Sequence, residues 1–285
     1  MTIAIDKKTC IKCGKCVRVC PSSIFKQTTP NDEVKQEHPQ SCIECGHCVG
    51  VCPTSSITHT VFPAEKVHPI NPEELPVPEQ VMLLIKSRRS NRAFSKKAIP
   101  SEKLDLILEA AHRAPTASNM QQVAFTLVTK PEEIKKILDL TIEIFVELGK
   151  LLSNPFIKPI MKPFLPEAYK YLPYLNKLKE EAAKGEDPIL RNATALLLIH
   201  TPAKSRFGCQ DANLAYQNGS LMAESLGISQ FYTGFLCMAL QFDRKNRIPE
   251  YLGIKGKIHA GMGLGIPAFK FLNYIDRKDI QVDKS

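Results

Sequence analysis

From residue 79 onwards, the order of apolar and polar residues predicts helices that alternate with strands. Three stretches repeat apolar residues at intervals of three and four, which is the spacing of a helix with one buried face. These stretches are 79–87, 102–114 and 209–227. Short apolar runs instead predict strands. The runs occupy 123–129, 193–200, 229–236 and 257–268.

Two details of this pattern lead to local predictions. Ser101 stands directly before the second helical stretch, and it is expected to be the N-cap because a serine hydroxyl accepts from the free N–H groups of a first turn. In the third stretch, Leu214, Leu221 and Leu226 lie near a common face.

The N-terminal 62 residues are organised by two copies of one cysteine motif. Residues 10–21 read CIKCGKCVRVCP and residues 42–53 read CIECGHCVGVCP, identical at nine of twelve positions. Each copy has the spacing C-x2-C-x2-C-x3-C-P, the run of two-cluster bacterial ferredoxins. Three close thiolates can bind one face of a [4Fe–4S] cluster from a short loop, and a glycine in each copy allows that loop to turn tightly.

The fourth cysteine of each copy is expected to complete the cluster of the other copy. One predicted ligand set is Cys10, Cys13, Cys16 and Cys52, and the other is Cys42, Cys45, Cys48 and Cys20. Zinc is the alternative, because paired cysteines also build zinc sites. Zinc requires neither a third close cysteine nor a Cys-Pro pair in each copy, so the spacing favours two [4Fe–4S] clusters.

The sequence between these regions predicts a linker. Residues 63–78 contain five prolines and no clear period, and proline-rich segments are extended and semi-rigid. We therefore expect a two-cluster ferredoxin domain over 1–62, a linker over 63–78 and a second domain over 79–285.

Composition narrows the classes of protein. Eight of the ten cysteines lie within residues 10–52, which favours metal or redox chemistry over disulfides. No apolar run approaches the roughly 18 residues needed to span a bilayer, and MTIAIDKKTC at the start lacks an apolar signal region. We expect a cytoplasmic protein with no membrane partner. The net charge of +9 comes from scattered residues, so no nucleic-acid partner is expected either.

Several polar segments of the second domain are candidates for ligand binding. Residues 88–94 read RRSNRAF, and their guanidinium groups can bind a phosphate bidentately; a solvent-exposed basic loop is the alternative. Residues 115–122 read PTASNMQQ and offer donors and acceptors suited to the edge of a heterocycle. Arg277 and Lys278 add two cations near the C-terminus. Cys209 and Cys237 are isolated, and structural roles are the default for such residues.

Taken together in this order, the segments resemble the nitroreductase family of FMN enzymes over residues 79–285. RRSNRAF is similar to the phosphate and ribityl motif of the family, and PTASNMQQ to its P-[ST]-x-x-N-x-Q-P loop. Residues 211–228 are similar to its long central helix, and 265–278 to its closing segment. Residues 1–62 resemble a bacterial two-cluster ferredoxin.

The nitroreductase resemblance implies an α+β fold with a central sheet and flanking helices. It also implies a homodimer with one FMN in each of two interface sites. The residues expected to contact FMN are Arg88, Arg89, Ser90, Arg92, Pro115, Thr116, Ser118, Asn119, Gln121, Thr233, Gly234, Arg277 and Lys278. We name no catalytic side chain, because the cofactor carries out the chemistry.

The chain departs from the family pattern in places. Gln122 replaces the usual proline after Gln121, and the chain has no tryptophan. Residues 141–190 form a long connection rich in Pro, Phe and Tyr. This segment is either a lid or cap that shapes a substrate pocket, or ordinary packing at a dimer interface.

These expectations combine into one functional hypothesis. The protein is an oxidoreductase in which clusters relay electrons to FMN, which reduces a small electrophilic acceptor of nitroaromatic or quinone-like type. The donor is a ferredoxin-type protein or NAD(P)H. The alternatives are a module that passes electrons between protein partners with little small-molecule turnover and, ranked last, a redox sensor.

Overall fold

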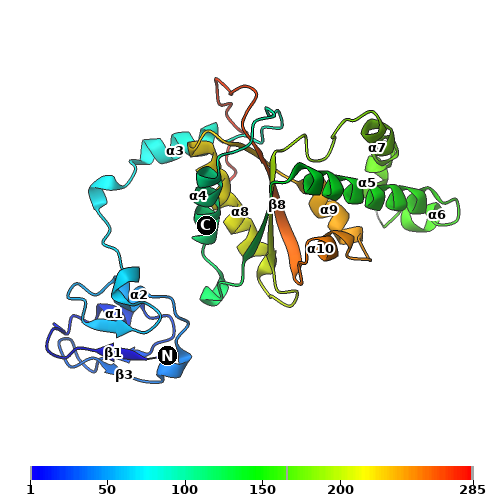
Figure 1. The fold of residues 1–285 in the computed structure, drawn as a ribbon. Coiled ribbons are helices and arrows are strands. Elements are labelled where there is room, and N and C mark those ends of the chain that lie inside the picture. The colour runs from blue at the N-terminus through cyan, green and yellow to red at the C-terminus, as the bar shows by residue number, and fades with distance from the viewer. Residues whose placement is uncertain (1, 165, 284–285) are drawn as a thin grey trace. The chain divides into compact units, whose positions relative to one another are not determined.

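The computed structural model of the protein describes residues 2–164 and 166–283 (Figure 1). The chain forms two compact units. Unit 1 comprises the residues up to 76 together with 117–120, and unit 2 comprises 77–116 and the residues from 121 onwards. Within the described residues, no helix is long and apolar enough to cross a bilayer.

Unit 1 is built from short elements around the two cysteine runs. Strand β1 pairs antiparallel with β4, and β2 with β3. The strands are β1 (Ile3–Ile5), β2 (Phe25–Lys26), β3 (Lys35–Gln36) and β4 (Ile57–His59). The helices and 3-10 turns are α1 (Lys15–Val19), η1 (Pro39–Ser41), α2 (His47–Gly50), η2 (Ala64–Lys66) and η3 (Pro72–Glu74).

The two copies of the cysteine motif fold alike. Helices α1 and α2 begin directly after Gly14 and Gly46, whose φ angles of 66° and 72° lie in the left-handed region. Glycine adopts this conformation without the steric cost of a Cβ atom. Each motif therefore turns sharply at its glycine and enters a single helical turn that carries its third cysteine.

Unit 2 contains a four-stranded antiparallel sheet in the order β5-β6-β8-β7. The strands are β5 (Ala124–Val128), β6 (Ala195–Thr201), β7 (Ser229–Tyr232) and β8 (Lys257–Gly265). The central strand β6 is buried on both faces. Leu196 and Leu198 point into one hydrophobic core, whereas Leu197 and Ile199 point into the other. This double burial explains why the sequence of β6 is a continuous apolar run.

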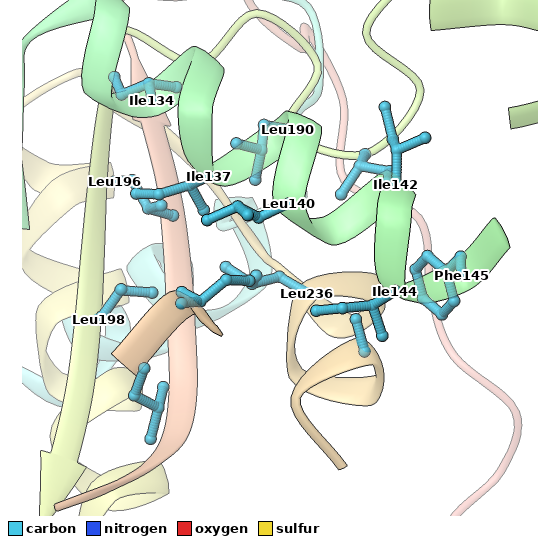
Figure 2. Close-up of a cluster of buried hydrophobic side chains, with 14 of the residues drawn as sticks. Ile134, Ile137, Leu140, Ile142, Ile144, Phe145, Leu190, Leu196, Leu198 and Leu236 are labelled. Carbon is cyan, nitrogen blue, oxygen red and sulfur yellow. The ribbon is translucent and has the colours of Figure 1, made fainter. Parts of the chain in front are cut away.

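Helices cover both faces of this sheet (Figure 1). They are α3 (Pro78–Ser87), α4 (Ser101–His112), α5 (Pro131–Ser153), α6 (Lys158–Met161), α7 (Pro166–Ala183), α8 (Gly208–Ser225), α9 (Gly234–Phe242) and α10 (Arg247–Tyr251). One core joins the sheet to α5, α7, α9 and α10, and Figure 2 shows its residues from α5, β6 and α9. The other core joins the sheet to α4 and α8.

Two local predictions were wrong. The strand expected over 229–236 ends at Tyr232, and helix α9 begins at Gly234. Ser101 is the first residue of α4 rather than its N-cap, and the side chain makes no capping hydrogen bond. The N-cap is Pro100, at φ −57° and ψ 139°. Because Pro100 takes the N-cap position, the helix starts one residue earlier than the capping pattern predicted.

Helix α8 packs by its small residues rather than by its leucines. Ala212, Ala215, Gly219 and Ala223 are buried, whereas Leu214 is 46% exposed. A Cβ atom on Gly219 would lie 3.3 Å from the Cβ atom of Ala111 in α4. The close approach of these two helices thus requires small residues, and it leaves Leu214 on an outer face of the unit.

Candidate functional site

The eight cysteines of unit 1 gather around two separate small cavities. One cavity is lined by Cys10, Cys13, Cys16 and Cys52. The other is lined by Cys20, Cys42, Cys45 and Cys48. Each cavity thus takes three thiols from one copy of the motif and the fourth from the other copy. These groups of four coincide with the two predicted ligand sets.

Backbone N–H groups point at the sulfur atoms in an arrangement that repeats between the copies. The amide of Ile24 donates to Cys20 Sγ at 3.4 Å, and the amide of Ser56 donates to Cys52 Sγ at 3.3 Å. Glu44 N donates to Cys42 Sγ at 3.3 Å. Such hydrogen bonds stabilise negative charge on sulfur and tune the potential of a bound cluster.

The surroundings of the thiols differ in their effect on ionisation. Burial raises the pKa of the Cys48 thiol to about 11. Burial also raises the pKa of Cys52, but backbone hydrogen bonds from Thr54 and Ser56 outweigh this effect, so that the pKa is lowered overall. A buried thiol with a raised pKa ionises only when a positive metal centre compensates its charge. Without such a centre, the Cys48 thiol therefore stays protonated near neutral pH.

His59 in strand β4 is a neighbour of the second cavity that the sequence did not indicate. Its Nε2 atom lies 3.7 Å from Cys42 Sγ, and its Nδ1 atom accepts a hydrogen bond from the amide of Val61 at 3.1 Å. The Nε2 atom is therefore the one that carries a proton toward sulfur when the imidazole is neutral. No sequence motif contains His59, because only the pairing of β1 with β4 brings it to the cavity.

The loop predicted to meet the edge of a heterocycle is divided between the units. Residues 117–120, which include the turn η4 (Ala117–Asn119), are grouped with unit 1. Within that unit, Asn119 Nδ2 donates to the backbone carbonyls of Ile43 at 3.0 Å and Glu44 at 2.8 Å. Asn119 thus contacts the backbone between Cys42 and Cys45.

The backbone of this loop is strained. Ser118, Asn119 and Gln121 have φ angles of 51°, 53° and 49°, a region that costs a non-glycine residue about 1 kcal/mol or more. Pro115, Thr116 and Gln121 belong to unit 2, where Gln121 N donates to Thr116 Oγ1 at 3.0 Å. Strain of this kind concentrates at ligand-binding sites.

In unit 2, the arginine-rich segment extends along the edge strand β7. Ser90 forms a parallel bridge with Gln230, and Phe94 forms an antiparallel bridge with Pro267. The guanidinium carbon of Arg92 lies 5.5 Å from the centre of the Phe231 ring. These contacts hold the backbone of the segment against the sheet, while the side chains of Ser90 and Arg92 are exposed.

Asn91 anchors the segment from its opposite side. Its side chain is buried, donates to Ser229 Oγ at 2.9 Å and accepts from the amide of Ala93 at 2.9 Å. Asn91 and Arg89 line a cavity of about 270 Å³, whereas Arg88, Ser90 and Arg92 do not. The segment therefore separates Arg89 from the other predicted phosphate ligands.

A polar cluster that the sequence did not reveal lies beside these cations. Tyr216 in α8 donates to Gln230 Oε1 at 2.5 Å. Burial raises the pKa of Tyr216, and the positive charges of Arg88 and Arg92 partly counteract this rise. The Nε2 atom of Gln230 is buried and has no acceptor among the described residues. It is a donor left available beside the cationic segment.

The turn after β7 presents backbone to a ligand. Thr233 is buried and its amide donates to the carbonyl of Gly261 at 2.9 Å. A Cβ atom on Gly261 would collide with Thr233 Oγ1, so this approach requires glycine. Gly234 is exposed and begins α9, and the first N–H groups of a helix have no partners within it. The amide of Thr233 is thus satisfied within the fold, whereas that of Gly234 belongs to the free first turn of α9.

Cys237 belongs to no sequence motif, and in the structure it lies beside the turn after β7, where its amide donates to the carbonyl of Thr233 at 3.0 Å. Burial raises the pKa of its thiol, while hydrogen bonds from Tyr232 and Thr233 lower it. The hydroxyl of Tyr232 also donates to the carbonyl of His259 at 3.0 Å. Cys237 therefore lies behind the Thr233–Gly234 turn. Cys209 is exposed at the start of α8.

The C-terminal segment returns to helix α3. Arg89 Nη2 lies 3.5 Å from the carbonyl oxygen of Ile275, and the Lys86 ammonium lies 5.0 Å from the centre of the Tyr274 ring. Arg277 and Lys278 follow directly and are exposed. The structure brings the chain just before them to Arg89, but no contact joins either residue to Arg88, Ser90 or Arg92 within the described part of the chain.

Comparison with known proteins identifies both parts of the chain. Residues 85–266 match the sequence profile described as "Nitroreductase family", and residues 2–53 match a "4Fe-4S dicluster domain". The sequence is 26% identical over 193 residues to an NADPH-dependent oxidoreductase of Staphylococcus saprophyticus, a match that covers 66% of this chain. The chain spans 65% of the length of that relative, slightly less than two thirds.

Solved structures agree on the fold of the larger unit. A nitroreductase with bound FMN from Bacteroides fragilis superposes with a TM-score of 0.55 at 21% identity, over 72% of this chain and 99% of that one. A second from Desulfitobacterium hafniense, also with bound FMN, gives 0.53 at 18% identity, over 72% and 98%. The predicted α+β fold is confirmed. Since the nitroreductase profile covers well over half of its residues, the chain belongs to the nitroreductase family, with a 4Fe-4S dicluster domain before the nitroreductase domain.

Proposed function

We propose that the protein is an FMN-dependent oxidoreductase whose two [4Fe–4S] clusters relay electrons to the flavin for reduction of a small electrophilic acceptor. The observation that carries the proposal is the grouping of eight cysteines into two sets of four within a chain of the nitroreductase family. Iron–sulfur clusters carry single electrons. Two sets of cluster ligands in the same chain as a nitroreductase domain therefore support a supply of electrons to the flavin one at a time.

The thiol groups fit iron–sulfur clusters better than zinc. A tetrahedral zinc site with Zn–S bonds of about 2.3 Å requires sulfur atoms within about 4 Å of each other. Among the described residues, no group of three or more His, Cys, Asp and Glu side chains is arranged to bind a single metal ion. A cubane cluster is larger and accepts more widely spaced thiolates around a cavity. We assign Cys10, Cys13, Cys16 and Cys52 to one cluster and Cys20, Cys42, Cys45 and Cys48 to the other.

The cationic segment of unit 2 fits the phosphate of FMN. Arg88, Ser90 and Arg92 provide charge and a hydroxyl, and guanidinium groups bind phosphate bidentately. Gln230 of β7, which pairs with Ser90, offers its unpartnered Nε2 atom as a further donor beside this segment. The two solved relatives from Bacteroides fragilis and Desulfitobacterium hafniense have FMN bound to the same fold. Bound FMN would supply the conversion between one-electron and two-electron chemistry.

The remaining predicted residues complete the proposed flavin site. The backbone N–H group of Gly234, at the start of α9, would bind the isoalloxazine edge, and Thr233 would contact the same edge. Pro115, Thr116, Ser118, Asn119 and Gln121 would contact the same ring system, and Arg277 and Lys278 would add positive charge near the phosphate. Arg89, which lines a separate cavity, would contribute only to the overall positive potential. A homodimer is part of the proposal. Leu214 of α8 is exposed, and α3 has no buried residue. A second subunit would cover this apolar surface.

The chain's own residues bind and orient the cofactors, and no side chain is assigned a proton-transfer role. Tyr216 stays protonated because burial raises its pKa, and its hydroxyl holds Gln230 in place. The acceptor class, nitroaromatic or quinone-like, and the donor, a ferredoxin-type protein or NAD(P)H, belong to the proposal. The name of the Staphylococcus saprophyticus relative supports NADPH as one donor to test.

An anaerobic titration followed by absorbance and EPR tests this proposal. Purified protein is expected to contain iron, sulfide and FMN, and a reduced ferredoxin is expected to reduce the clusters before the flavin. Turnover of a quinone or nitroaromatic acceptor should follow. Rapid bleaching of the flavin by NADPH or NADH while the clusters lag would contradict the relay. Electron transfer to a protein acceptor without small-molecule turnover would identify an electron-transfer module instead.

A further inference from the structure

The turn between α5 and α7 carries large apolar side chains that face solvent. We call residues 154–164, which include α6, the basic tip. Phe156 is 82% exposed, Ile160 is 65% exposed and Phe164 is 79% exposed. Figure 1 shows α6 at the outer end of the long helix α5, on the far side of that helix from the sheet. Large exposed apolar patches of this kind mark interaction surfaces.

The charge of this region has a single sign. Between residues 148 and 166 the sequence contains Lys150, Lys158 and Lys162 and no aspartate or glutamate. In the part of the chain that the structure describes, neither Lys158 nor Lys162 forms an ion pair. Both are exposed beside the phenylalanines. The surface is therefore apolar and cationic at the same time.

The tip is built to present these side chains. Asn154 ends α5, and its Oδ1 atom accepts from the amide of Phe156 at 2.9 Å, which directs the chain away from the helix axis. Pro155, Pro159 and Pro163 then restrict the backbone. Behind the tip, Phe145 and Leu152 of α5 are buried. The buried part of α5 thus anchors the basic tip, and the side chains of the tip face outward.

The positively charged residues of this region are all lysines, and this choice indicates the kind of partner that the surface binds. Protein–protein interfaces are enriched in arginine and depleted in lysine, yet all three cations of this region are lysines. Lysine side chains interleaved with phenylalanine and isoleucine are instead typical of segments that lie in the interface of a bilayer, where the apolar groups enter the headgroup boundary and the ammonium groups meet anionic lipids.

We propose that the basic tip docks on the surface of an anionic phospholipid bilayer. This inference is independent of the proposed redox chemistry. It also departs from the absence of a membrane partner expected from the sequence, because that expectation considered only segments long enough to span. Docking requires insertion of Phe156, Ile160 and Phe164 to the depth of the headgroups, together with the attraction of Lys150, Lys158 and Lys162.

Co-sedimentation of the full-length, cofactor-loaded protein with vesicles tests the proposal. Phosphatidylcholine vesicles are compared with vesicles that also contain phosphatidylglycerol. We expect binding to the mixed vesicles that weakens as salt screens the charges. Lys158→Gln with Lys162→Gln should lower the affinity about thirtyfold, since each lysine near an anionic surface contributes about a fivefold gain in affinity. Phe156→Ser with Phe164→Ser should lower it at least about tenfold.

Matched variants outside the tip serve as controls. Ile70→Ser removes an apolar side chain that is 79% exposed, and Lys96→Gln with Lys97→Gln removes two exposed lysines. Both should bind vesicles like the parent protein. The proposal is wrong if the parent binds neither vesicle, binds both equally, or loses no affinity in the tip variants. It is also wrong if the phenylalanine variant changes the oligomeric state, because the tip is then a contact between copies of the chain.

Discussion

The two units of the chain differ in what holds them together. In unit 1, the buried apolar cluster consists of Ile3, Ile24, Phe25, Val34, Cys48 and Ile57, and the strands are two or three residues long. In unit 2, a four-stranded sheet separates two large hydrophobic cores. Domains as small as unit 1 usually need disulfides or metals to be stable. We therefore expect unit 1 to depend on its proposed clusters for stability, whereas unit 2 is stabilised by buried apolar surface.

The largest expected effect comes from removing one thiol of unit 1. Cys48→Ala deletes a buried ligand of the second cavity, and we expect loss of cluster absorbance and cleavage of unit 1 by protease, with unit 2 still resistant. Iron analysis and limited proteolysis measure this. Cys209→Ala, an exposed cysteine of unit 2, is the control and should keep the iron. A Cys48→Ala protein with full iron content would show that unit 1 does not rely on this ligand.

The corresponding change in unit 2 removes a buried apolar side chain and leaves a cavity in the core. Leu198 in the central strand β6 is fully buried, and Leu198→Ala should lower the free energy of unfolding of unit 2 by about 2–5 kcal/mol. Thermal unfolding followed by circular dichroism reports the loss, and cluster absorbance below that transition should be unchanged. Leu214→Ala, at an exposed position of α8, should change the stability of the isolated subunit little. Equal losses for both leucines would contradict the assignment of the core.

A smaller effect distinguishes the two copies within unit 1. Alanine at Gly14 or Gly46 must adopt a left-handed φ, which costs about 1–2 kcal/mol. At Gly14 the new Cβ atom would also lie 2.5 Å from Gln27 Oε1, and the Gln27 amide is held by the carbonyls of Lys12 and Asp32. At Gly46 it would meet the ring edge of Phe62 at 3.3 Å.

We therefore expect Gly14→Ala to destabilise unit 1 more than Gly46→Ala does. The rate at which cluster absorbance is lost in urea measures the difference under anaerobic conditions. Gly50→Ala is the control, because a Cβ atom at that position meets nothing within 4 Å. The reverse order of the two rates would show that Gln27 moves aside.

The smallest effect is a pH dependence of unit 2. Burial lowers the pKa of His200 and of His259, and the charge of Lys257 lowers that of His259 further. The unfolded state therefore binds more protons than the folded state as the pH falls below the ordinary histidine pKa of about 6.5. Unit 2 should keep its full stability above that value and lose part of it as the pH falls toward the lower folded-state pKa values.

Thermal unfolding of unit 2 between about pH 7 and about pH 5 detects this loss. His200→Gln should flatten the dependence, because glutamine does not titrate and can still bond to Thr126, whose Oγ1 lies 3.0 Å from His200 Nε2. An unchanged pH profile in this variant would assign the dependence to other groups.

The features that could be predicted from the sequence are those set by residues close to one another along the chain. The spacing of cysteines within each copy is set by a short loop, and the strands at 123–129 and 193–200 follow from continuous apolar runs. The contact of Tyr216 with Gln230 and the approach of His59 to Cys42 could not be predicted, because each depends on which segments pair in space.

Other features could not be predicted because the residue type at a position suggested a different role from the one it has in the structure. The leucines of α8 suggested a packing face, yet the close approach of α4 selects alanine and glycine for burial. Asn91 was part of the arginine motif but had no evident role until its bond to Ser229 placed it as an anchor. The left-handed backbone at Ser118, Asn119 and Gln121 contains no glycine that would have revealed it.

The exchange of the fourth cysteine between the copies has a consequence for how unit 1 could be divided. Each cavity draws three thiols from one copy and one from the other, so a peptide that carries one copy offers an incomplete set at two places. Such a half-length peptide could complete its sets only by pairing reciprocally with a second molecule of itself, each giving its fourth cysteine to the other. The two copies of the motif in this single chain are therefore related to each other as the two subunits of a symmetric dimer would be.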